Sequence, residues 1–328
     1  MVTIALDMDN LRKFMEKINS GGKPPAFLRY NEPMSRHTTF KLGGRADVWV
    51  RPQKNIFPDY TARLLKNAEE EGIPVFILGA GANIVVSDKG IRGIVLDTGS
   101  FRGIGKREKI TGEQERSMFS VSALAGTSID GLCSRLADRR LSGLESFAGM
   151  PGSLGGAVWM NARCYEKSVS DVLLETEILD ENFRREIIPF NSGDFSYKKS
   201  PFQSRKALIL SARLAVKLRD SAEIHRDNDS FRRDRREKGH FRCPSAGSAF
   251  KNNRDFGEST GKIIDELGLK GLTAGGAQIA PWHGNIVINT GKATAADIKN
   301  LMNETARRVK EERGFELENE VLFVGDWD

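Results

Sequence analysis

The sequence predicts an α+β protein built from two domains. Its 328 residues exceed the usual single-domain size of roughly 100 to 200 residues, so we expect the chain to divide. Helical and strand-like hydrophobic patterns are mixed along the chain, and the composition, 39% hydrophobic and 29% charged, is that of an ordinary globular protein. We expect residues 1–25 to be an appendage, residues 26–218 a first domain and residues 219–328 a second.

The first domain is expected to open after an amphipathic helix over 8–18 and a Gly/Pro-rich joint at 21–25. Longer apolar periodicity predicts helices near 57–71 and 127–140, and short alternating or buried apolar runs predict strands. The predicted strands are 45–51, 74–78, 84–87, 93–97, 118–123, 172–180, 185–190 and 207–216.

The second domain follows a run of alternating charges at 225–242, which we interpret as a solvated helix or connector. Beyond it the patterns predict two helices and two strands, at 260–267, 285–289, 294–313 and 315–325. In the last strand the two-residue alternation places Glu316, Glu318 and Glu320 on one face.

The net charge of +6 fits an anionic partner, either nucleic acid or small molecules. The charged run interleaves acidic residues with arginines and holds no aromatic stacking platform, which argues against nucleic acid. The three cysteines lack the spacing of a zinc site or a disulfide framework. No stretch approaches the roughly 20 apolar residues of a membrane span, and no signal pattern opens the chain, so we expect a cytoplasmic protein.

Two glycine-rich loops form the first candidate ligand site. Residues 79–83, Gly-Ala-Gly-Ala-Asn, lie between two predicted strands, where backbone amides can form an anion-binding nest, although a tight hairpin-like turn is the better explanation of this loop taken alone. No GxGxxG follows, so a Rossmann site is not supported. Residues 149–157 hold four glycines and a proline, which favours a ligand lying against the backbone over close packing. Together the loops predict a pyrophosphate-containing cofactor.

Three segments add polar groups. Ser248 follows Gly247, with Lys251 three residues on, and is a candidate nucleophile, proton donor or turn residue. Without a GxSxG elbow or a triad order among the histidines, a catalytic Ser248 would deliver a proton rather than attack. Residues 196–202 place Lys198 beside an aromatic and, taken alone, read as a surface loop. Composition does not choose among the three glutamates near the C-terminus.

In this order the motifs resemble those of the UDP-N-acetylenolpyruvoylglucosamine reductase family, flavoenzymes that complete UDP-N-acetylmuramate synthesis for bacterial peptidoglycan. The resemblance runs from about residue 35 to the C-terminus. Its eight motifs are TTFKLGG (38–44), LGAGAN (78–83), FAGMPGSLGGAVWMNA (147–162), YKKSPF (197–202), PSAGSAFKN (244–252), GLKGLTAGGAQIA (268–280), HGNIVIN (283–289) and LENEVLF (317–323).

The resemblance implies a vanillyl-alcohol-oxidase/PCMH-type, two-part FAD-binding domain followed by a smaller α+β substrate-binding domain. Ser248 matches the family's general acid, Glu320 matches a glutamate at the reacting carboxylate, and Lys198 stands where the family has a catalytic arginine. The implied FAD contacts are Gly79, Gly81, Asn83, Gly149, Pro151, Gly152, Gly155, Gly156 and Ala157. The implied substrate contacts are Tyr165, Tyr197, Lys251 and Asn252.

The implied reaction reduces UDP-N-acetylglucosamine enolpyruvate with NADPH. Hydride passes from NADPH to FAD and then to the enolpyruvyl methylene, cationic groups stabilise the resulting enolate, and Ser248 protonates the adjacent carbon. NADPH, the UDP moiety and the carboxylate are all anionic, which would explain the net positive charge of the chain. We expect a monomer with no nucleic acid, membrane or metal partner.

The chain departs from the family pattern at four places. Lys198 keeps the charge of the arginine but lacks its bidentate fork, so either Lys198 substitutes imperfectly or a nearby cation shares the work. Ala82 replaces a serine, Arg163 and Cys164 interrupt a run of small residues, and Asn253 replaces a proline. The strand predicted near 207 follows the YKKSPF motif closely, which indicates the shorter subclass.

Three alternatives stay open at this point. The chain could be another flavin oxidoreductase of the same superfamily that acts on an alcohol or sugar, although the GSAFKN and LENEV motifs argue against this. It could bind nucleic acid through residues 225–242. The change at Lys198 could also mark a slow or repurposed member of the family.

Overall fold

The computed structural model describes residues 7–20, 24–25, 27–110 and 118–328 and divides the chain into two compact units. Unit 1 comprises Met1–Arg29, Val48–Ala80 and Gly93–Arg233, and unit 2 comprises Tyr30–Asp47, Gly81–Arg92 and Asp234–Asp328. Each unit therefore draws on separate stretches of the sequence. Unit 2 includes two short segments from the region predicted as the first domain.

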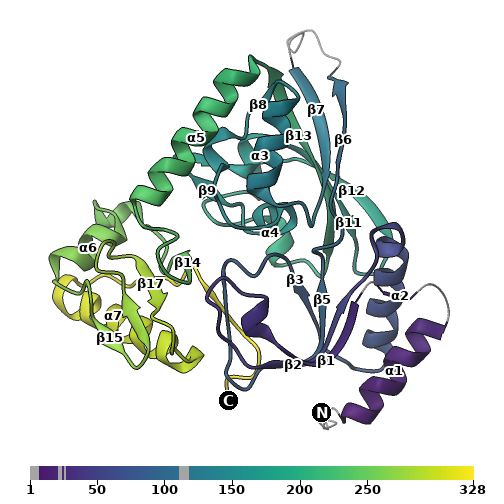
Figure 1. Cartoon of the computed structure of the whole chain (residues 1–328), viewed down its shortest axis with the longest axis horizontal. Helices are drawn as coiled ribbons and strands as arrows, with labels where there is room; N and C mark the ends of the chain where they lie inside the picture. Colours follow the sequence, from purple (N-terminus) through teal and green to yellow (C-terminus); the bar gives the residue numbers. More distant parts are fainter. Residues whose placement is uncertain (1–6, 21–23, 26, 111–117) are drawn as a thin grey trace. The chain divides into compact units, whose positions relative to one another are not determined.

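A four-stranded sheet runs in the order β1-β2-β5-β3, with bounds Phe27–Pro33, Arg45–Arg51, Ile91–Asp97 and Val75–Leu78. Helices α1 (Met8–Ser20) and α2 (Phe57–Glu70) lie side by side in unit 1 (Figure 1), where Tyr60 Oη donates to Asn19 Oδ1 at 3.0 Å. The apolar face of α1 is buried, as its amphipathic pattern predicts. Residues 21–23 of the predicted joint lie outside the described residues.

The larger sheet of unit 1 runs in the order β12-β11-β13-β7-β6, with β8 also paired to β13. Helices α3 (Ile129–Asp138) and α4 (Leu154–Trp159) pack on it and share a core with β7 and β13 (Figure 1). The longest strand, β13, lies in the middle of this sheet. Its apolar side chains are buried along much of its length, which accounts for the central position. The strand bounds are Arg185–Pro189, Leu173–Leu179, Leu208–Leu218, Met118–Leu124, Ile104–Lys109 and Leu141–Ser142.

Residues 225–237 of the charged run lie in helix α5 (Ser221–Glu237), so the helix of the two interpretations, a solvated helix or a connector, is confirmed for most of the run. Arg232 within the helix and Arg219, two residues before it, form ion pairs. Arg219 Nη1 lies 2.5 Å from Asp227 Oδ2, and Arg232 Nε lies 2.7 Å from Asp130 Oδ1. These ion pairs fix the helix to its surroundings.

Unit 2 is built on a sheet ordered β14-β17-β16-β15, with α6 (Thr260–Glu266) and α7 (Ala295–Arg313) packed around it. Its strands are Ser245–Ser248, Ile286–Asn289, Ala277–Ile279 and Thr273–Ala274. Helix α7 begins at a Thr294–Asp297 capping box and ends at Gly314, whose φ is 71°. A separate parallel pair joins β4 (Ile84–Val86) to β18 (Leu322–Val324).

The predicted terminal strand over 315–325 is wrong in extent. Of this described stretch only Leu322–Val324 forms a strand, and Asn319 forms an isolated bridge with Phe250. Without a continuous ladder the two-residue alternation breaks down: Asn319 is exposed, and Glu320 is half-buried whereas Glu318 is exposed. A shared face for the three glutamates is therefore not formed.

Candidate active site

The start of the first glycine-rich loop, Gly79, lies against the second loop in unit 1. A Cβ atom on Gly79 would lie 2.6 Å from Ser153 Oγ, so glycine is needed for this close approach. Ser153 is buried and caps α4, since its Oγ accepts from the amide of Gly156 at 3.4 Å. Buried Ala157 donates its amide to the Ser153 carbonyl at 2.9 Å. Ser153 therefore places a hydroxyl beside Gly79.

The glycines of the second loop have two different surroundings: one is closely packed, and another has open space around it. Gly155 is a packing glycine, because a Cβ there would lie 2.9 Å from the Cβ of Ala125. Gly152 has a φ of 146° and no neighbouring atom within 4 Å of the Cβ position, while Pro151 and Gly156 are exposed. This open backbone, bordered by a hydroxyl, fits a cofactor that carries phosphates.

Helix α5 is connected to the second glycine loop through one carboxylate. Asp130 Oδ1 accepts from the amide of Gly149 at 2.7 Å and from Arg232 Nε at 2.7 Å. Gly149 itself has a φ of 75°, a conformation that favours glycine. The charged helix therefore helps to hold the start of the loop.

Gly81 and Asn83 belong to unit 2 and have structural partners there. A Cβ on Gly81, whose φ is 62°, would lie 2.0 Å from the carbonyl oxygen of His37. Asn83 Nδ2 donates to the Glu320 carbonyl at 2.9 Å, and Leu322 donates its amide to the Asn83 carbonyl at 3.0 Å. Asn83 therefore holds the segment that carries Glu320, and its contact with FAD stays a prediction.

Ser248 and Glu320 come together in unit 2. Ser248 ends strand β14, where it pairs with Ile286, and it is half-buried. The amide of Glu320 donates to the carbonyl of Ala249, the next residue, at 2.8 Å. The backbone segments that carry Ser248 and Glu320 are therefore adjacent, although the two residues are 72 positions apart in the chain.

The structure distinguishes the three glutamates that composition left equal. Glu316 and Glu318 are exposed and ion-paired, the first to Lys310 at 2.7 Å and the second to Lys251. Glu320 is half-buried. Glu320 is therefore the carboxylate held in a partly enclosed position beside Ser248.

Lys251 and Asn252 anchor the segment that follows Ser248. The Lys251 amide donates to the Glu318 carbonyl at 2.8 Å. Asn252 Oδ1 accepts from the amide of Thr260 at 2.9 Å, at the start of α6, and Thr260 Oγ1 donates to the Lys251 carbonyl at 2.8 Å. Contacts of both side chains with a substrate stay predictions.

Lys198 lies in a tight turn of unit 1. Ser196 and Lys199 exchange two backbone hydrogen bonds of 3.2 and 3.1 Å across Tyr197 and Lys198. Lys198 has a φ of 57° and is 8% exposed, whereas Tyr197 is 40% exposed. The lysine ammonium lies 6.0 Å from the centre of the Tyr197 ring.

Tyr165 lies at the tip of a two-residue hairpin turn. The turn joins β9 (Arg163–Cys164) to β10 (Lys167–Ser168), and both Tyr165 and Glu166 have positive φ. The Tyr165 ring packs on that of Phe231 in α5, with 4.7 Å between ring centres. Arg163 Nη2 contacts the Glu166 carboxylate at 2.5 Å, so the departure from small residues adds an ion pair to the hairpin.

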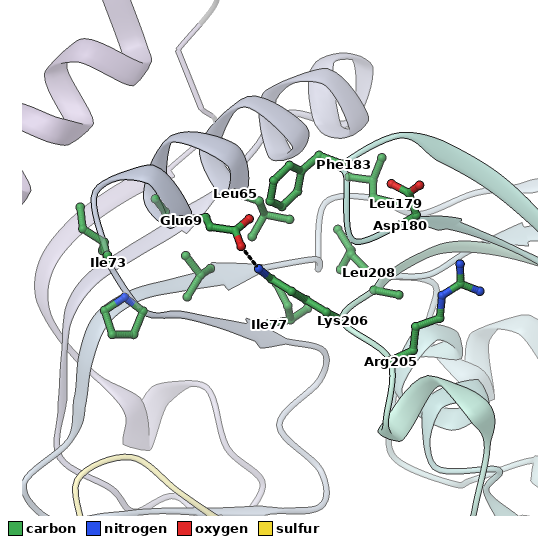
Figure 2. Close-up of a pocket in the computed structure, with 15 residues that line it drawn as sticks. Leu65, Glu69, Ile73, Ile77, Leu179, Asp180, Phe183, Arg205, Lys206 and Leu208 are labelled. Atoms are coloured by element: carbon green, nitrogen blue, oxygen red, sulfur yellow. Dashed lines mark hydrogen bonds and ion pairs between the residues drawn. The ribbon is translucent and has the colours of Figure 1, made fainter. Parts of the chain in front are cut away.

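A separate cavity of about 430 Å³ lies in unit 1 between α2 and the turn that joins β11 to β12. Figure 2 shows Lys206 reaching Glu69 across it. Arg205, also in its wall, is paired with Glu186 at 2.5 Å. The predicted site residues do not line this cavity, and its cations are already paired with carboxylates.

Two histidines of unit 2 are held in their neutral form. Burial, together with the charge of Arg235, lowers the pKa of His240 to about 4. Burial also lowers the pKa of His283, whose ring centre lies 6.0 Å from that of His240. Among the described residues there is no cluster of three or more His, Cys, Asp or Glu side chains arranged to hold a metal ion.

Known proteins match both parts of this chain. The model of the C-terminal domain of UDP-N-acetylenolpyruvoylglucosamine reductase matches residues 238–324, and that of an FAD-binding domain matches residues 58–182. The reductase of Treponema denticola is 42% identical over 312 residues, which covers 92% of this chain and 94% of the relative. The chain belongs to the UDP-N-acetylenolpyruvoylglucosamine reductase family.

Further family members agree. The reductase of Borreliella burgdorferi is 38% identical and covers 96% of this chain and 98% of its own length. The crystal structure of the reductase from Thermus caldophilus has a TM-score of 0.71 and 32% identity, and it covers 91% of this chain and 100% of its own.

The predicted family, the fold class, the FAD cofactor and the FAD-dependent oxidoreductase activity in peptidoglycan precursor synthesis are confirmed. In the described part of the chain, no helix is long and apolar enough to cross a membrane.

Sequence reasoning missed three residues that hold the site in shape: Asp130, Asn161 and Gln203. Asn161 bonds to Ser196 in the loop of Lys198 across 35 residues, and Gln203 bonds both to nearby Lys198 and, across 44 residues, to Trp159. No local pattern marks such contacts. Only the position of Asn161 inside a family motif offered a signal.

Proposed function

We propose that this protein reduces the enolpyruvyl double bond of UDP-N-acetylglucosamine enolpyruvate, with NADPH as reductant and FAD as cofactor. Membership of the reductase family carries the proposal. FAD binding at residues 79–83 and 149–157 is supported by the open backbone at Gly152 and by the Ser153 hydroxyl beside Gly79, which suit phosphate groups. When bound and reduced by NADPH, FAD would supply the hydride that adds to the methylene carbon of the substrate.

Ser248 is the general acid in this proposal. Hydride addition at one carbon of the double bond leaves an enolate, and a proton must reach the other carbon to complete the saturated product. The half-buried hydroxyl of Ser248 is held at the end of a paired strand, which favours defined proton delivery.

Glu320 and Lys198 act at the substrate carboxylate and the developing enolate. Glu320 is supported by its backbone bond to Ala249, next to Ser248. Lys198 is supported by its family position and by its low exposure, since a cation that is largely removed from water stabilises negative charge more strongly. Tyr165, Tyr197, Lys251 and Asn252 are the proposed substrate contacts.

The domain boundaries form part of the proposal. Residues 26–218 bind FAD and residues 219–328 bind substrate, in line with the matched ranges 58–182 and 238–324. We place the enzyme in the cytoplasm, where NADPH is available, and propose that it works as a monomer on a UDP-sugar.

Separating the two half-reactions tests the role of Ser248. In Ser248→Ala, NADPH should bleach the flavin at the wild-type rate, because the first half-reaction does not use the hydroxyl. Reoxidation by UDP-N-acetylglucosamine enolpyruvate should slow by about 10²- to 10⁴-fold, the usual contribution of a positioned acid. Stopped-flow flavin absorbance measures both rates.

Ser245→Ala on the same strand is the matched control and should reoxidise at the wild-type rate. Equal reoxidation by Ser248→Ala and the wild type would remove Ser248 as the acid. A wild-type flavin that simple sugars reoxidise, but the enolpyruvyl substrate does not, would overturn the proposed function itself.

A further inference from the structure

The turn that carries Lys198 adopts an unfavourable backbone conformation. A positive φ at the third position of a tight turn favours glycine or asparagine, yet this position holds a lysine with a φ of 57°. The side chain is nevertheless only 8% exposed. Such a conformation persists only where neighbouring groups hold it in place.

Two amide side chains hold the turn, one on each side. Asn161 Nδ2 donates to the Ser196 carbonyl at 2.9 Å, while its Oδ1 accepts from the Ser170 amide at 3.1 Å. Gln203 Nε2 donates to the Lys198 carbonyl at 3.0 Å and to the Trp159 carbonyl at 3.1 Å. Asn161 is 2% exposed, so its bonds are shielded from water.

Both bonds connect the turn to the end of helix α4. Trp159 is the last residue of α4, and Ser200 Oγ also donates to its carbonyl, at 2.6 Å. Helix α4 contains the last glycines of the second loop, so one short element positions both the loop and the turn. The fork of an arginine would orient itself on a carboxylate, whereas a lysine ammonium depends more on where its backbone is held.

We infer that Gln203 and Asn161 are positioning residues that hold Lys198 in place for the reaction. The inference rests on the proposed function, because it takes Lys198 as the cation at the substrate. Neither side chain needs to touch the substrate for this role. Each acts by fixing a carbonyl of the turn.

Gln203 offers the sharper test, because three replacements separate shape from hydrogen bonding. Gln203→Met keeps the length but cannot donate, Gln203→Glu places an acceptor against two carbonyl oxygens, and Gln203→Lys restores donors. We expect kcat to fall about tenfold to hundredfold in the first two variants, the usual cost of a misplaced catalytic group, and to return near wild type in the third. Flavin reduction by NADPH should stay unchanged in all three.

Asn161→Asp supplies a second variant that folds on the same backbone, since aspartate tolerates a positive φ, here 43°. It keeps the acceptor for Ser170 and loses the donor to Ser196. Gln53→Met is the matched control, because Gln53 also donates to a backbone carbonyl, that of Pro24 at 2.9 Å, elsewhere in unit 1. The control should leave kcat unchanged.

Two readouts tie the effect to Lys198. In a Lys198→Ala background, Gln203→Met should change kcat by less than about twofold, because the group that it positions is already gone. Trypsin should cut the folded enzyme after Lys198 faster in Gln203→Met than in wild type, a readout that does not depend on activity.

The outcomes separate the inference from the proposed function. Unchanged trypsin cleavage, or a full additional loss of kcat in the Lys198→Ala background, would overturn the positioning role. If Lys198→Ala alone kept wild-type turnover, the role of Lys198 in the proposed function would fail, and the cleavage rates would still show whether Gln203 holds the turn.

Discussion

Gly81 and Gly72 share a left-handed backbone, with φ of 62° and 66°, but their surroundings differ. The Cβ position of Gly81 is filled by the His37 carbonyl, while that of Gly72 is open within 4 Å. A sequence shows both as glycines in loops. Only the structure shows that the first is fixed by backbone contact and the second by conformation alone.

Alanine at these two positions should therefore have different costs. Gly72→Ala should lower the free energy of unfolding by about 1 to 2 kcal/mol, the cost of a left-handed residue with a Cβ. Gly81→Ala should lose about 1 to 3 kcal/mol more, because the backbone must also move away from the new atom. Urea unfolding of both variants measures the difference, and equal losses would contradict the predicted clash.

His240 links stability to pH. Its pKa in the folded protein, about 4, lies below the ordinary value of 6.5, because burial disfavours the charged ring. The unfolded chain therefore binds a proton at a higher pH than the folded chain does. The stability that comes from keeping His240 neutral is fully present above about pH 6.5 and is lost as the pH falls from there towards 4.

Replacing His240 by glutamine should flatten this dependence. We expect the fall in melting temperature between pH 7 and pH 4.5 to be smaller in His240→Gln than in wild type, with His283 retaining part of the effect. An unchanged slope in His240→Gln would show that the ring does not titrate as expected.

Helix α5 helps to hold the second glycine loop in place. Its Arg232 holds Asp130, which in turn holds the amide of Gly149 at the start of the second glycine loop. Loss of Asp130 would leave that amide without this acceptor. The loop would then have to be ordered when FAD binds, which costs binding free energy.

Asp130→Ala should weaken FAD binding about 10-fold to 150-fold, the equivalent of one hydrogen bond to a charged group. Asp130→Asn retains an acceptor for Gly149 and should lose less. Fluorescence titration of the apoprotein with FAD measures both affinities. Equal affinities in wild type and Asp130→Ala would show that the loop is ordered without this contact.

The long elements were predictable because they repeat a pattern. Helices α2, α3 and α7 and strands β2, β11 and β13 carry periodic apolar positions, and all six lie close to their predicted bounds. Helix α4 was missed because two of its six residues are glycines, which are poor helix formers. Here Ser153 and the packing against Ala125 outweigh local preference.

For the whole molecule, bound FAD should act as a stabilising ligand. At a free concentration of 100 times its dissociation constant, FAD should raise the free energy of unfolding by about 2.7 kcal/mol. Melting of the apoprotein with increasing FAD measures this. Riboflavin, which lacks the phosphates, should stabilise far less if the glycine loops bind them, and equal effects would argue against that role.

The catalytic residues of the site could be predicted from the sequence, but the contacts that hold them in place could not. The order of eight motifs identified the family and thereby Ser248, Glu320 and Lys198. Nothing local revealed that Glu320 is the half-buried glutamate, or that Gln203 and Asn161 hold the lysine turn. The burial of Glu320, the bond of Asn161 to Ser196 and the bond of Gln203 to Trp159 depend on contacts between distant segments, which a single sequence does not encode in any local pattern.

The pairing of β4 with β18 has a consequence for synthesis on the ribosome. Asn83 bonds to Glu320, which is 237 residues later in the chain. The first glycine loop therefore cannot form this bond until nearly the whole chain has been synthesised. At about 5 to 20 residues per second this delay lasts roughly 12 to 47 seconds. During that time β4 has an open edge that other chains can pair with. The cofactor is therefore expected to load after translation ends, and truncated chains that stop before residue 322 should be prone to aggregate.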